Sequence, residues 1–349
     1  MERKTVIKTA CALCLMALSW LPMSGQNAPM RGDVDGNQAV NVTDAIVLLN
    51  YLQYNDASMI DMTAADVNYS NSVDISDVIE LINYLINNVW TDVPYEPVIE
   101  TFTVGDVTFN MVKVTGGTFM MGASDDDALA KSWEKPRHEV TLSDYYIGET
   151  EVTQGLWKAV MGSNPSWFQY AYESDYAYTD DLTRPVERVT YANVQSFLTK
   201  LKQKTGKTFR LPTEAEWEFA ARGGNYSKGY TFPGSDDIDE VAWHTGNSSL
   251  YVPNADRYEN MPHPVGTKAP NELGIYDMGG NVAEWTSDWY GLYSDAAVTN
   301  PTGPASGTAR VVRGGSWGQA WRMNRVSYRY EGFPTSPNVN TGLRLVLVP

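Results

Sequence analysis

Apolar residues recur every three or four positions in two short stretches of the first hundred residues, and this spacing predicts two helices. The apolar positions of these helices are, in chain order, Ile46, Leu49, Leu52, Val78, Ile82 and Leu85. Each helix follows a segment rich in Asp and Asn, and residues 32–52 resemble residues 65–85 at an offset of 33 residues. The chain therefore contains a duplicated loop-and-helix unit, which we place at residues 31–90.

The same spacing predicts three more helices in the C-terminal part of the chain, at residues 153–161, 191–205 and 213–222. Thr213 and Glu216 form a capping box at the start of the last helix. Strands are predicted at residues 107–114, 140–147, 311–313 and 343–348. Long irregular connections separate these elements, so we predict one mixed α+β domain at residues 101–349. A proline-containing linker at residues 91–100 precedes it.

The first 25 residues have the layout of a secretory signal peptide. Three basic residues come first, an uncharged and mostly apolar run covers residues 10–21, and the small residues Ser24 and Gly25 follow. The run is short for a membrane span. A membrane anchor is the alternative, although no stop-transfer sequence follows. We expect an exported protein, in the periplasm, at the cell surface or outside the cell, with no membrane span in the mature chain.

Composition narrows the chemistry that the exported chain can carry out. The two cysteines, Cys11 and Cys14, lie inside the predicted signal peptide. The mature chain therefore has no disulfide, no thiolate metal site and no cysteine nucleophile. The formal net charge of −16 argues against nucleic acid and anionic membranes as partners. Residues 31–90 contain nine acidic residues and one basic residue, so bound cations are expected there.

Both loops of the duplicated unit have the ligand spacing of a twelve-residue calcium loop. Such a loop supplies oxygen ligands at positions 1, 3, 5, 7, 9 and 12, because a hard cation prefers many oxygens. In the first loop these positions are Asp33, Asp35, Asn37, the Ala39 carbonyl, Asn41 and Asp44. In the second loop they are Asp66, Asn68, Ser70, the Ser72 carbonyl, Asp74 and Asp77. A solvated acidic segment with coincidental spacing is the alternative.

The duplicated unit resembles a type I dockerin, in which each calcium loop is followed by a single helix and ends in aspartate. Both loops lack the usual glycine at position six, where Gln38 and Asn71 stand. The resemblance implies structural calcium and a cohesin-like protein partner. Residues 42–43 and 75–76 correspond to the positions that steer cohesin choice, and they lack the double hydroxyl common in cellulosomal dockerins. Another protein partner is therefore left open.

Six stretches of the large domain follow one another in a characteristic order. They read MVKVTGGTFMMG at 111–122, ETEVTQGLW at 149–157, FRLPTEAEWEFAARGG at 209–224, LGIYDMGGNVAEW at 273–285, RGGSW at 313–317 and NTGLRL at 340–345. Together they resemble the formylglycine-generating enzyme family, also called sulfatase-modifying factors, over about residues 105–349. The resemblance implies a C-type-lectin-like α+β fold with few regular elements.

The same resemblance indicates where catalytic copper would lie. The family's oxidase binds copper through two cysteines in the segment after RGGS and oxidises a cysteine of a sulfatase to formylglycine. Here that segment, residues 318–324, contains no cysteine, and Met323 is a poor replacement for the thiolates that copper(I) prefers. We expect no copper and no catalytic residues, and we predict a binding protein. A divergent formylglycine-generating oxidase is the alternative.

The resemblance also implies structural calcium in the large domain. The family's calcium segment corresponds to the Asp277 side chain, the Gly280 and Val282 carbonyls and the Glu284 side chain. In an alignment that needs a gap, a second calcium would correspond to Asn247, the Ser248 carbonyl, Asp256 and the Tyr258 carbonyl. A hydrogen-bonded loop without metal is the alternative for both sets.

An aromatic stretch marks a candidate ligand surface. Residues 167–181 contain four tyrosines and four carboxylates, and aromatic rings with polar tips favour interfaces. This stretch could line the binding site of a protein or glycan ligand, or it could pack on its own domain. Trp317 and Trp321 raise the same question beside the segment 318–324.

Overall fold

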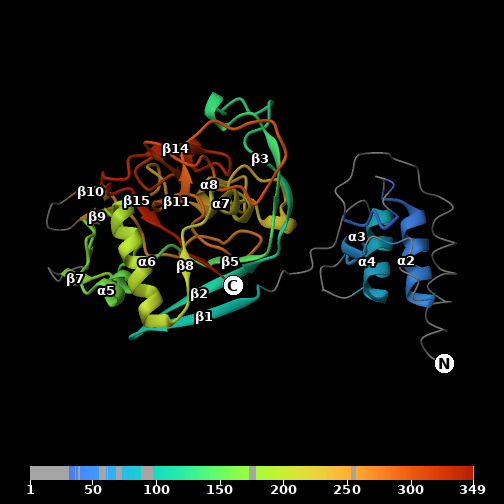
Figure 1. The fold of residues 1–349 in the computed structure, drawn as a ribbon, viewed down its shortest axis with the longest axis horizontal. Helices are drawn as coiled ribbons and strands as arrows, with labels where there is room; N and C mark the ends of the chain where they lie inside the picture. Colours follow the sequence, from blue (N-terminus) through green and yellow to red (C-terminus); the bar gives the residue numbers. More distant parts are fainter. Residues whose placement is uncertain are drawn as a thin grey trace. The chain divides into compact units, whose positions relative to one another are not determined.

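The computed structural model describes residues 31–35, 37, 40–54, 60, 62–67, 73–87, 97–172, 178–252 and 257–348. The chain forms two compact units, residues 1–95 and 96–349 (Figure 1). The predicted signal peptide and most of the predicted linker lie outside the described residues. Ile99 and Glu100, at the end of the predicted linker, belong instead to the first strand of the second unit, β1 (Ile99–Val104).

The first unit consists of helices α2 (Val42–Tyr54), α3 (Met62–Ala65) and α4 (Ile75–Asn87). Helices α2 and α4, which follow the two loops, pack side by side as Figure 1 shows. Their core pairs buried residues that stand 33 positions apart in the sequence, namely Val34 with Val67, Ala45 with Val78, and Leu48 with Leu81. The sequence repeat is therefore also a structural repeat, since equivalent positions meet in one small core.

The second unit contains three larger sheets. The antiparallel five-stranded sheet has the order β1, β2 (Val107–Val114), β5 (Tyr145–Gly148), β16 (Val346–Leu347) and β8 (Phe209–Arg210). The four-stranded sheet has the order β14 (Arg329–Gly332), β13 (Arg310–Arg313), β11 (Ala283–Trp289) and β15 (Thr341–Leu343), in which β11 and β15 are parallel. The three-stranded sheet has the order β12 (Val298–Thr299), β4 (His138–Leu142) and β3 (Gly117–Met121).

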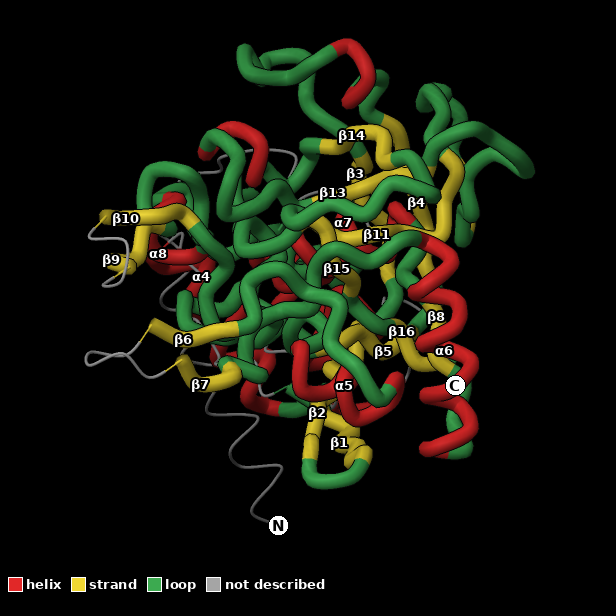
Figure 2. Tube along the Cα trace, turned by 90° about the vertical axis from the view of Figure 1, so that its left-hand side faces the viewer, coloured by secondary structure: helices red, strands yellow, loops and turns green. Residues whose placement is uncertain are grey.

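The helices of the second unit are α5 (Gln154–Met161), α6 (Tyr191–Thr205), α7 (Glu214–Ala221) and α8 (Ile238–Val241). Helices α5 and α6 lie beside the five-stranded sheet (Figure 2), and the rings of Trp157 and Phe197 stack between them at 4.7 Å. The predicted helices are confirmed, and the hydroxyl of Thr213 accepts the Glu216 N–H as the capping box requires.

Two strand predictions are wrong, because each predicted strand is two strands. The range 140–147 divides into β4 and β5, which belong to different sheets, and the Asp144 carboxylate accepts the Gly116 N–H at the turn between them. The range 343–348 divides into β15 and β16. The break falls at Arg344, whose buried side chain pairs with Glu284.

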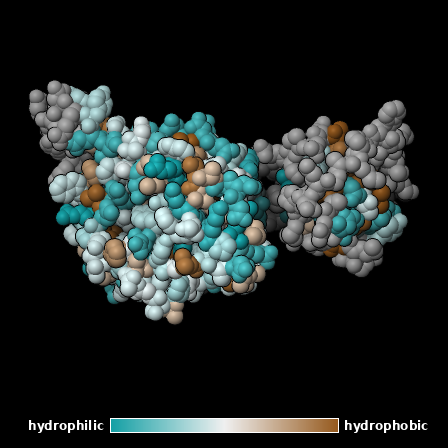
Figure 3. Space-filling model, turned by 90° about the horizontal axis from the view of Figure 1, so that it is seen from above, coloured by the Kyte–Doolittle hydropathy of each residue, from teal (hydrophilic) through white to brown (hydrophobic). Residues whose placement is uncertain are grey.

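Two hairpins lie near each other at one edge of the second unit in both Figure 1 and Figure 2. They are β6 (Tyr170–Tyr172) with β7 (Tyr178–Asp180), and β9 (Ser249–Val252) with β10 (Arg257–Asn260). On the face of this unit seen in Figure 3, hydrophobic residues form only small, separate patches. None of the described helices combines the length and the apolar character that crossing a bilayer requires.

Helix α7 is buried along its whole length although three of its eight residues are glutamates. Each of these glutamates forms an ion pair with at least one arginine. The pairs are Glu214 with Arg329, Glu216 with Arg210, and Glu218 with Arg313 and Arg222. Glu218 and Arg313 are both fully buried, and their closest atoms are 2.6 Å apart. The ion pairs tie α7 to strands β8, β13 and β14.

We predict that Glu218→Ala lowers the free energy of unfolding by about 3–5 kcal/mol, because it leaves the buried guanidinium of Arg313 without its carboxylate. Urea denaturation followed by tryptophan fluorescence measures the change. The matched control is Glu100→Ala, which removes an exposed partner of Lys207 at 3.4 Å and should cost about 1 kcal/mol or less. Equal losses in the two variants would contradict the assignment.

Candidate calcium sites and a candidate ligand surface

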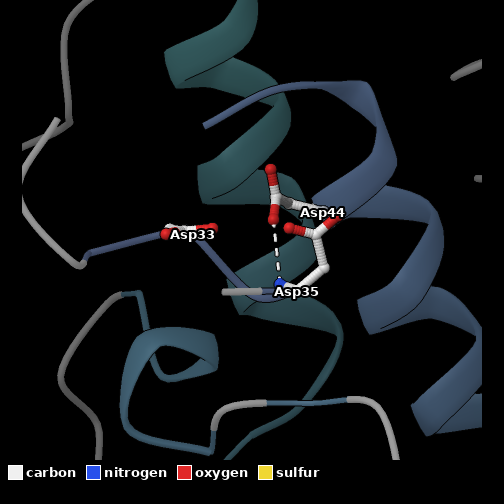
Figure 4. A group of neighbouring side chains, drawn as sticks. All are labelled: Asp33, Asp35 and Asp44. Atoms are coloured by element: carbon white, nitrogen blue, oxygen red, sulfur yellow. Dashed lines mark hydrogen bonds between the residues drawn. The ribbon is translucent and has the colours of Figure 1, made fainter. Parts of the chain in front are cut away.

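Three carboxylates meet in the first loop of the helical unit (Figure 4). Asp33, Asp35 and Asp44 each offer an oxygen that lies within 4.8 Å of the other two. Asp44 comes from the first turn of α2 and is buried, whereas Asp33 and Asp35 lie in the preceding turn. Carboxylates this close repel one another unless a cation or a proton neutralises them. The oxygen-only donor set fits a hard cation such as calcium.

Hydrogen bonds from the backbone hold these carboxylates in place. One oxygen of Asp44 accepts the Asp35 N–H at 3.1 Å, and the other accepts the Asn41 N–H at 2.8 Å. Asp33 accepts the Asn37 N–H at 2.9 Å. Burial raises the pKa of Asp44 to about 6. The structure thus brings together three of the six predicted residues as oxygen donors, Asp33, Asp35 and Asp44. The Asn37 side chain donates to Asp35 at 2.8 Å, the Asn41 side-chain oxygen accepts the Thr43 N–H at 2.7 Å, and Ala39 lies outside the described residues.

The described part of the second loop repeats the contact that closes the first. The Asp77 carboxylate accepts the Asp74 N–H at 2.8 Å, as the Asp44 carboxylate accepts that of Asn41. Asp77 is fully buried, like Asp44. Asp66 is also described, whereas the other predicted ligands of this loop lie outside the described residues, namely Asn68, Ser70 and Ser72.

In the large domain, Asp277 and Glu284 have different surroundings. Asp277 is buried at a positive φ of 55°, and its Oδ2 accepts the Gly266 N–H at 2.7 Å. Its buried Oδ1 has no hydrogen-bond partner in the described chain. Glu284 is bound by Arg344 at 2.8 Å and by the Trp217 indole N–H at 2.7 Å. Burial raises the pKa of Asp277 to about 6.

Glu151 is a third buried carboxylate here that the sequence prediction missed. Its two oxygens accept the Val282 N–H and the Asn281 side-chain N–H, each at 3.0 Å. Burial and the charges of Asp277 and Glu284 raise its pKa well above the usual range. Its place in the ETEVT stretch, just before α5, is the signal that could have identified it. One arginine therefore faces three carboxylates, and this excess of negative charge fits an additional cation.

The residues predicted for a second calcium in the large domain form hydrogen bonds with other protein groups. The Asn247 side-chain oxygen accepts the His244 N–H at 2.8 Å. The Ser248 carbonyl lies 3.1 Å from the His263 Nε2 and 3.3 Å from the Met261 backbone nitrogen, which donates to it. Tyr258 is 72% exposed on β10, and Asp256 lies outside the described residues. The described contacts are those of a hydrogen-bonded loop, the alternative that the sequence leaves open.

The segment 318–324 is where copper would be bound in the family's oxidase. Its last four residues form a short 3-10 helix, Trp321–Asn324. The buried Asn324 donates its side-chain N–H to the Trp321 carbonyl at 3.1 Å, and the Trp321 ring meets Phe232 edge-on at 6.2 Å. Asn324 is the one buried residue of this segment, and the Trp321 side chain remains 44% exposed.

The aromatic stretch divides into packed and exposed residues. Phe168 meets Trp317 edge-on at 5.1 Å, and the Trp317 indole N–H donates to the Val339 carbonyl at 3.3 Å. Trp167, in contrast, is 64% exposed, and the Arg188 guanidinium lies 5.5 Å from its ring centroid. Trp167 is thus available to a ligand, whereas Phe168 and Trp317 pack against each other within the domain. The side chains of residues 170–180 lie outside the described part.

Two cavities lie elsewhere. One of about 300 Å³ lies between α6 and β8, and the other, of about 350 Å³, lies between β8 and the turn after β12. Arg210 and Ser287 line both. The guanidinium of Arg210 is already bound by both oxygens of Glu216, at 2.6 and 2.7 Å. Neither cavity is lined by a residue that the sequence predicts as a ligand.

Comparison with known proteins identifies both units. Residues 96–348 match the family described as sulfatase-modifying factor enzyme 1-like domain, and residues 31–86 match the dockerin type I domain. The chain is 34% identical to chaperone protein LppX of Paenibacillus barcinonensis, over 69% of this chain and 90% of that protein. It is 30% identical to the formylglycine-generating enzyme of Thermomonospora curvata, over 70% of this chain and 95% of that enzyme.

Among solved structures, Treponema denticola variable protein 1 is similar with a TM-score of 0.63 and 33% identity, covering 73% of this chain and 100% of that one. The two predicted family resemblances and the α+β fold class are confirmed.

We predict that calcium removal lowers the melting temperature of the large domain through Asp277. Nine of the ten tryptophans that follow the predicted signal peptide lie in residues 96–348, and the tenth is Trp90, so tryptophan fluorescence of the mature protein reports mainly on this domain. Chelation should lower the melting temperature of the wild type, because binding to the folded state alone stabilises it. Asp277→Asn should abolish the difference, while it keeps an acceptor for the Gly266 N–H.

The matched control is Asp288→Asn, which changes another buried carboxylate outside this cluster and should leave the calcium effect intact. If the wild-type domain melts at the same temperature in calcium and in chelator, Asp277 and Glu284 are hydrogen-bonding residues only.

Proposed function

The chain belongs to the family of sulfatase-modifying factor enzyme 1-like domains through residues 96–348 and to the type I dockerins through residues 31–86, and from this premise we propose an exported, non-catalytic binding protein. Its large domain recognises a protein or glycan ligand. Its helical module docks the chain to a partner protein when calcium is bound.

The observation that carries the non-catalytic assignment is the segment 318–324. It has no cysteine, and the side chain of its one buried residue, Asn324, is bound to the Trp321 carbonyl. Without thiolates, copper(I) lacks the soft ligands that hold it and that the oxidation of a substrate thiol requires. A relative named as a chaperone, with 34% identity, supports a binding role for this fold.

Calcium supports the docking role through the geometry of the module. Bound at Asp33, Asp35 and Asp44, it would neutralise their charges and fix the loop against the start of α2. Ile46 on α2 and Ile79 on α4 occupy equivalent places in the repeat, and they are 42% and 54% exposed. A module of this kind, held in shape by calcium, presents these apolar side chains to a cohesin-like or other protein partner.

Export and docking are mutually consistent. The basic and apolar start of the chain supports secretion, and a docking module suits a protein assembled with others at the cell surface, in the periplasm or outside the cell.

The second candidate function is a divergent formylglycine-generating oxidase. The 30% identity to an enzyme of that name favours it. We predict that the mature protein leaves a cysteine-containing sulfatase peptide unmodified when copper and oxygen are supplied, as measured by mass spectrometry. The Thermomonospora curvata enzyme, assayed in parallel, is the positive control. Conversion of the cysteine to formylglycine by the mature protein would overturn the non-catalytic assignment.

For the module, we predict that Asp33→Ala and Asp66→Ala each remove one calcium ion from the total that the mature protein binds in calorimetric titration. Each change deletes the first ligand of one loop. Helical circular dichroism should also fall in chelator, because the carboxylates then repel one another beside two short helices. Asp126→Ala, at an exposed acidic residue of the large domain, is the control. An unchanged calcium count in both loop variants would refute the assignment.

A further inference from the structure

Trp167 and Arg188 form an exposed pair at the surface of the large domain. The indole is 64% exposed, and the guanidinium carbon of Arg188 lies 5.5 Å from its ring centroid. Arg188 is itself exposed and forms no ion pair with any residue that the structure describes. Its φ of 62° lies in the left-handed region, which residues other than glycine adopt at a cost and which is frequent at functional sites.

Hydrogen bonds from buried side chains hold the backbone of the loop that carries Trp167. The fully buried Glu187 accepts the backbone N–H groups of both Trp167 and Phe168 with one oxygen, the latter at 2.9 Å. The Gln154 side chain donates to the Phe168 carbonyl at 2.8 Å. On the other side, the Arg188 N–H donates to the Asn338 carbonyl at 3.0 Å. The backbone that carries both side chains is therefore fixed before any ligand arrives, which lowers the entropic cost of binding.

A second cation–tryptophan pair in the domain shows what a purely structural arrangement looks like. Trp243 has the Lys268 ammonium over its ring at 4.1 Å and the His263 ring stacked at 3.6 Å with an interplanar angle of 5°. Two partners therefore cover that indole. No ring of a described residue stacks on Trp167, and most of its surface remains exposed.

We propose that Trp167 and Arg188 bind a sugar that carries a carboxylate or a sulfate, which specifies the ligand class under the proposed binding function. The indole face packs against the apolar C–H face of the sugar ring. The Arg188 guanidinium, whose central carbon lies 5.5 Å from the indole centroid, offers its N–H groups for a two-point contact with the acid. The acid supplies the counter-charge that Arg188 lacks.

The geometry favours a sugar over an acidic peptide. Neither Trp167 nor Arg188 lines either of the two cavities described above. A flat exposed indole suits a ring. The net charge of −16 also disfavours a densely charged polyanion, which leaves a sugar with isolated acidic groups.

The test is calorimetric titration of the mature protein with four probes. These are a trisaccharide that carries one uronic acid, the same trisaccharide with one sulfate ester in place of the acid, the neutral trisaccharide, and an acidic hexapeptide. We expect binding of the uronate, the sulfated sugar or both, and affinity for the other two at least about tenfold weaker. The uronate and sulfate arms distinguish the two sources of the acid.

Three variants locate the site. Trp167→Ala and Arg188→Asn should each weaken binding about tenfold or more, and asparagine tolerates the left-handed φ that Arg188 adopts. Arg188→Lys keeps the charge but not the planar fork, and it should lose an intermediate amount. Lys268→Ala, from the pair whose ring is covered by two partners, is the matched control and should bind like the wild type. Circular dichroism confirms that each variant is folded.

Unchanged affinity in folded Trp167→Ala and Arg188→Asn, or preference for the peptide or the neutral sugar, would overturn the proposal. So would failure of both acidic sugars to bind. These outcomes leave the non-catalytic assignment standing, because that assignment depends on the sulfatase-peptide assay.

Discussion

Helix α7 can lie inside the large domain only because its three glutamates are paired with arginines. A carboxylate buried without a partner would cost several kcal/mol, whereas a pair with two or more short contacts removes most of that penalty. Glu214 and Arg329 form such a pair, with contacts of 2.6 and 2.7 Å. Arg329 and Arg313 lie 115 and 95 residues from their glutamates in the sequence. These two pairs connect α7 to the four-stranded sheet, and Arg210 connects it to the five-stranded sheet. In a domain with long irregular connections, these ion pairs hold the secondary-structure elements together, as continuous sheets do in other folds.

The same framework positions the segment that would carry copper in the family's oxidase. Arg313, paired with Glu218, opens the RGGSW turn. Gly314 and Gly315 follow with φ of 93° and 69°, and a side chain on Gly314 would meet the Trp217 ring at 3.1 Å. A side chain on Gly315 would also meet the Met323 carbonyl oxygen at 2.6 Å. The turn is therefore confined both by Trp217 of α7 and by the end of the segment 318–324, and changes within that segment must keep this close approach.

Local signals in the sequence determined what could be predicted. The capped helices were predictable because Thr213 and Glu216 act within one turn, and the carboxylate cluster of the first loop because its three residues lie within twelve positions. Interactions between residues far apart in the sequence could not be predicted from local patterns. The break between β15 and β16 depends on the pairing of Arg344 with Glu284, 60 residues away. Glu151 escaped notice because its neighbours in the site lie about 130 residues later.

We propose that this protein binds metal for structure and not for catalysis. Anomalous X-ray diffraction from crystals of the mature protein, grown with calcium and soaked with copper(I), distinguishes the two roles. We expect a calcium peak among Asp33, Asp35 and Asp44 and no copper peak at residues 318–324. A copper peak bound by Met323 in that segment would contradict it.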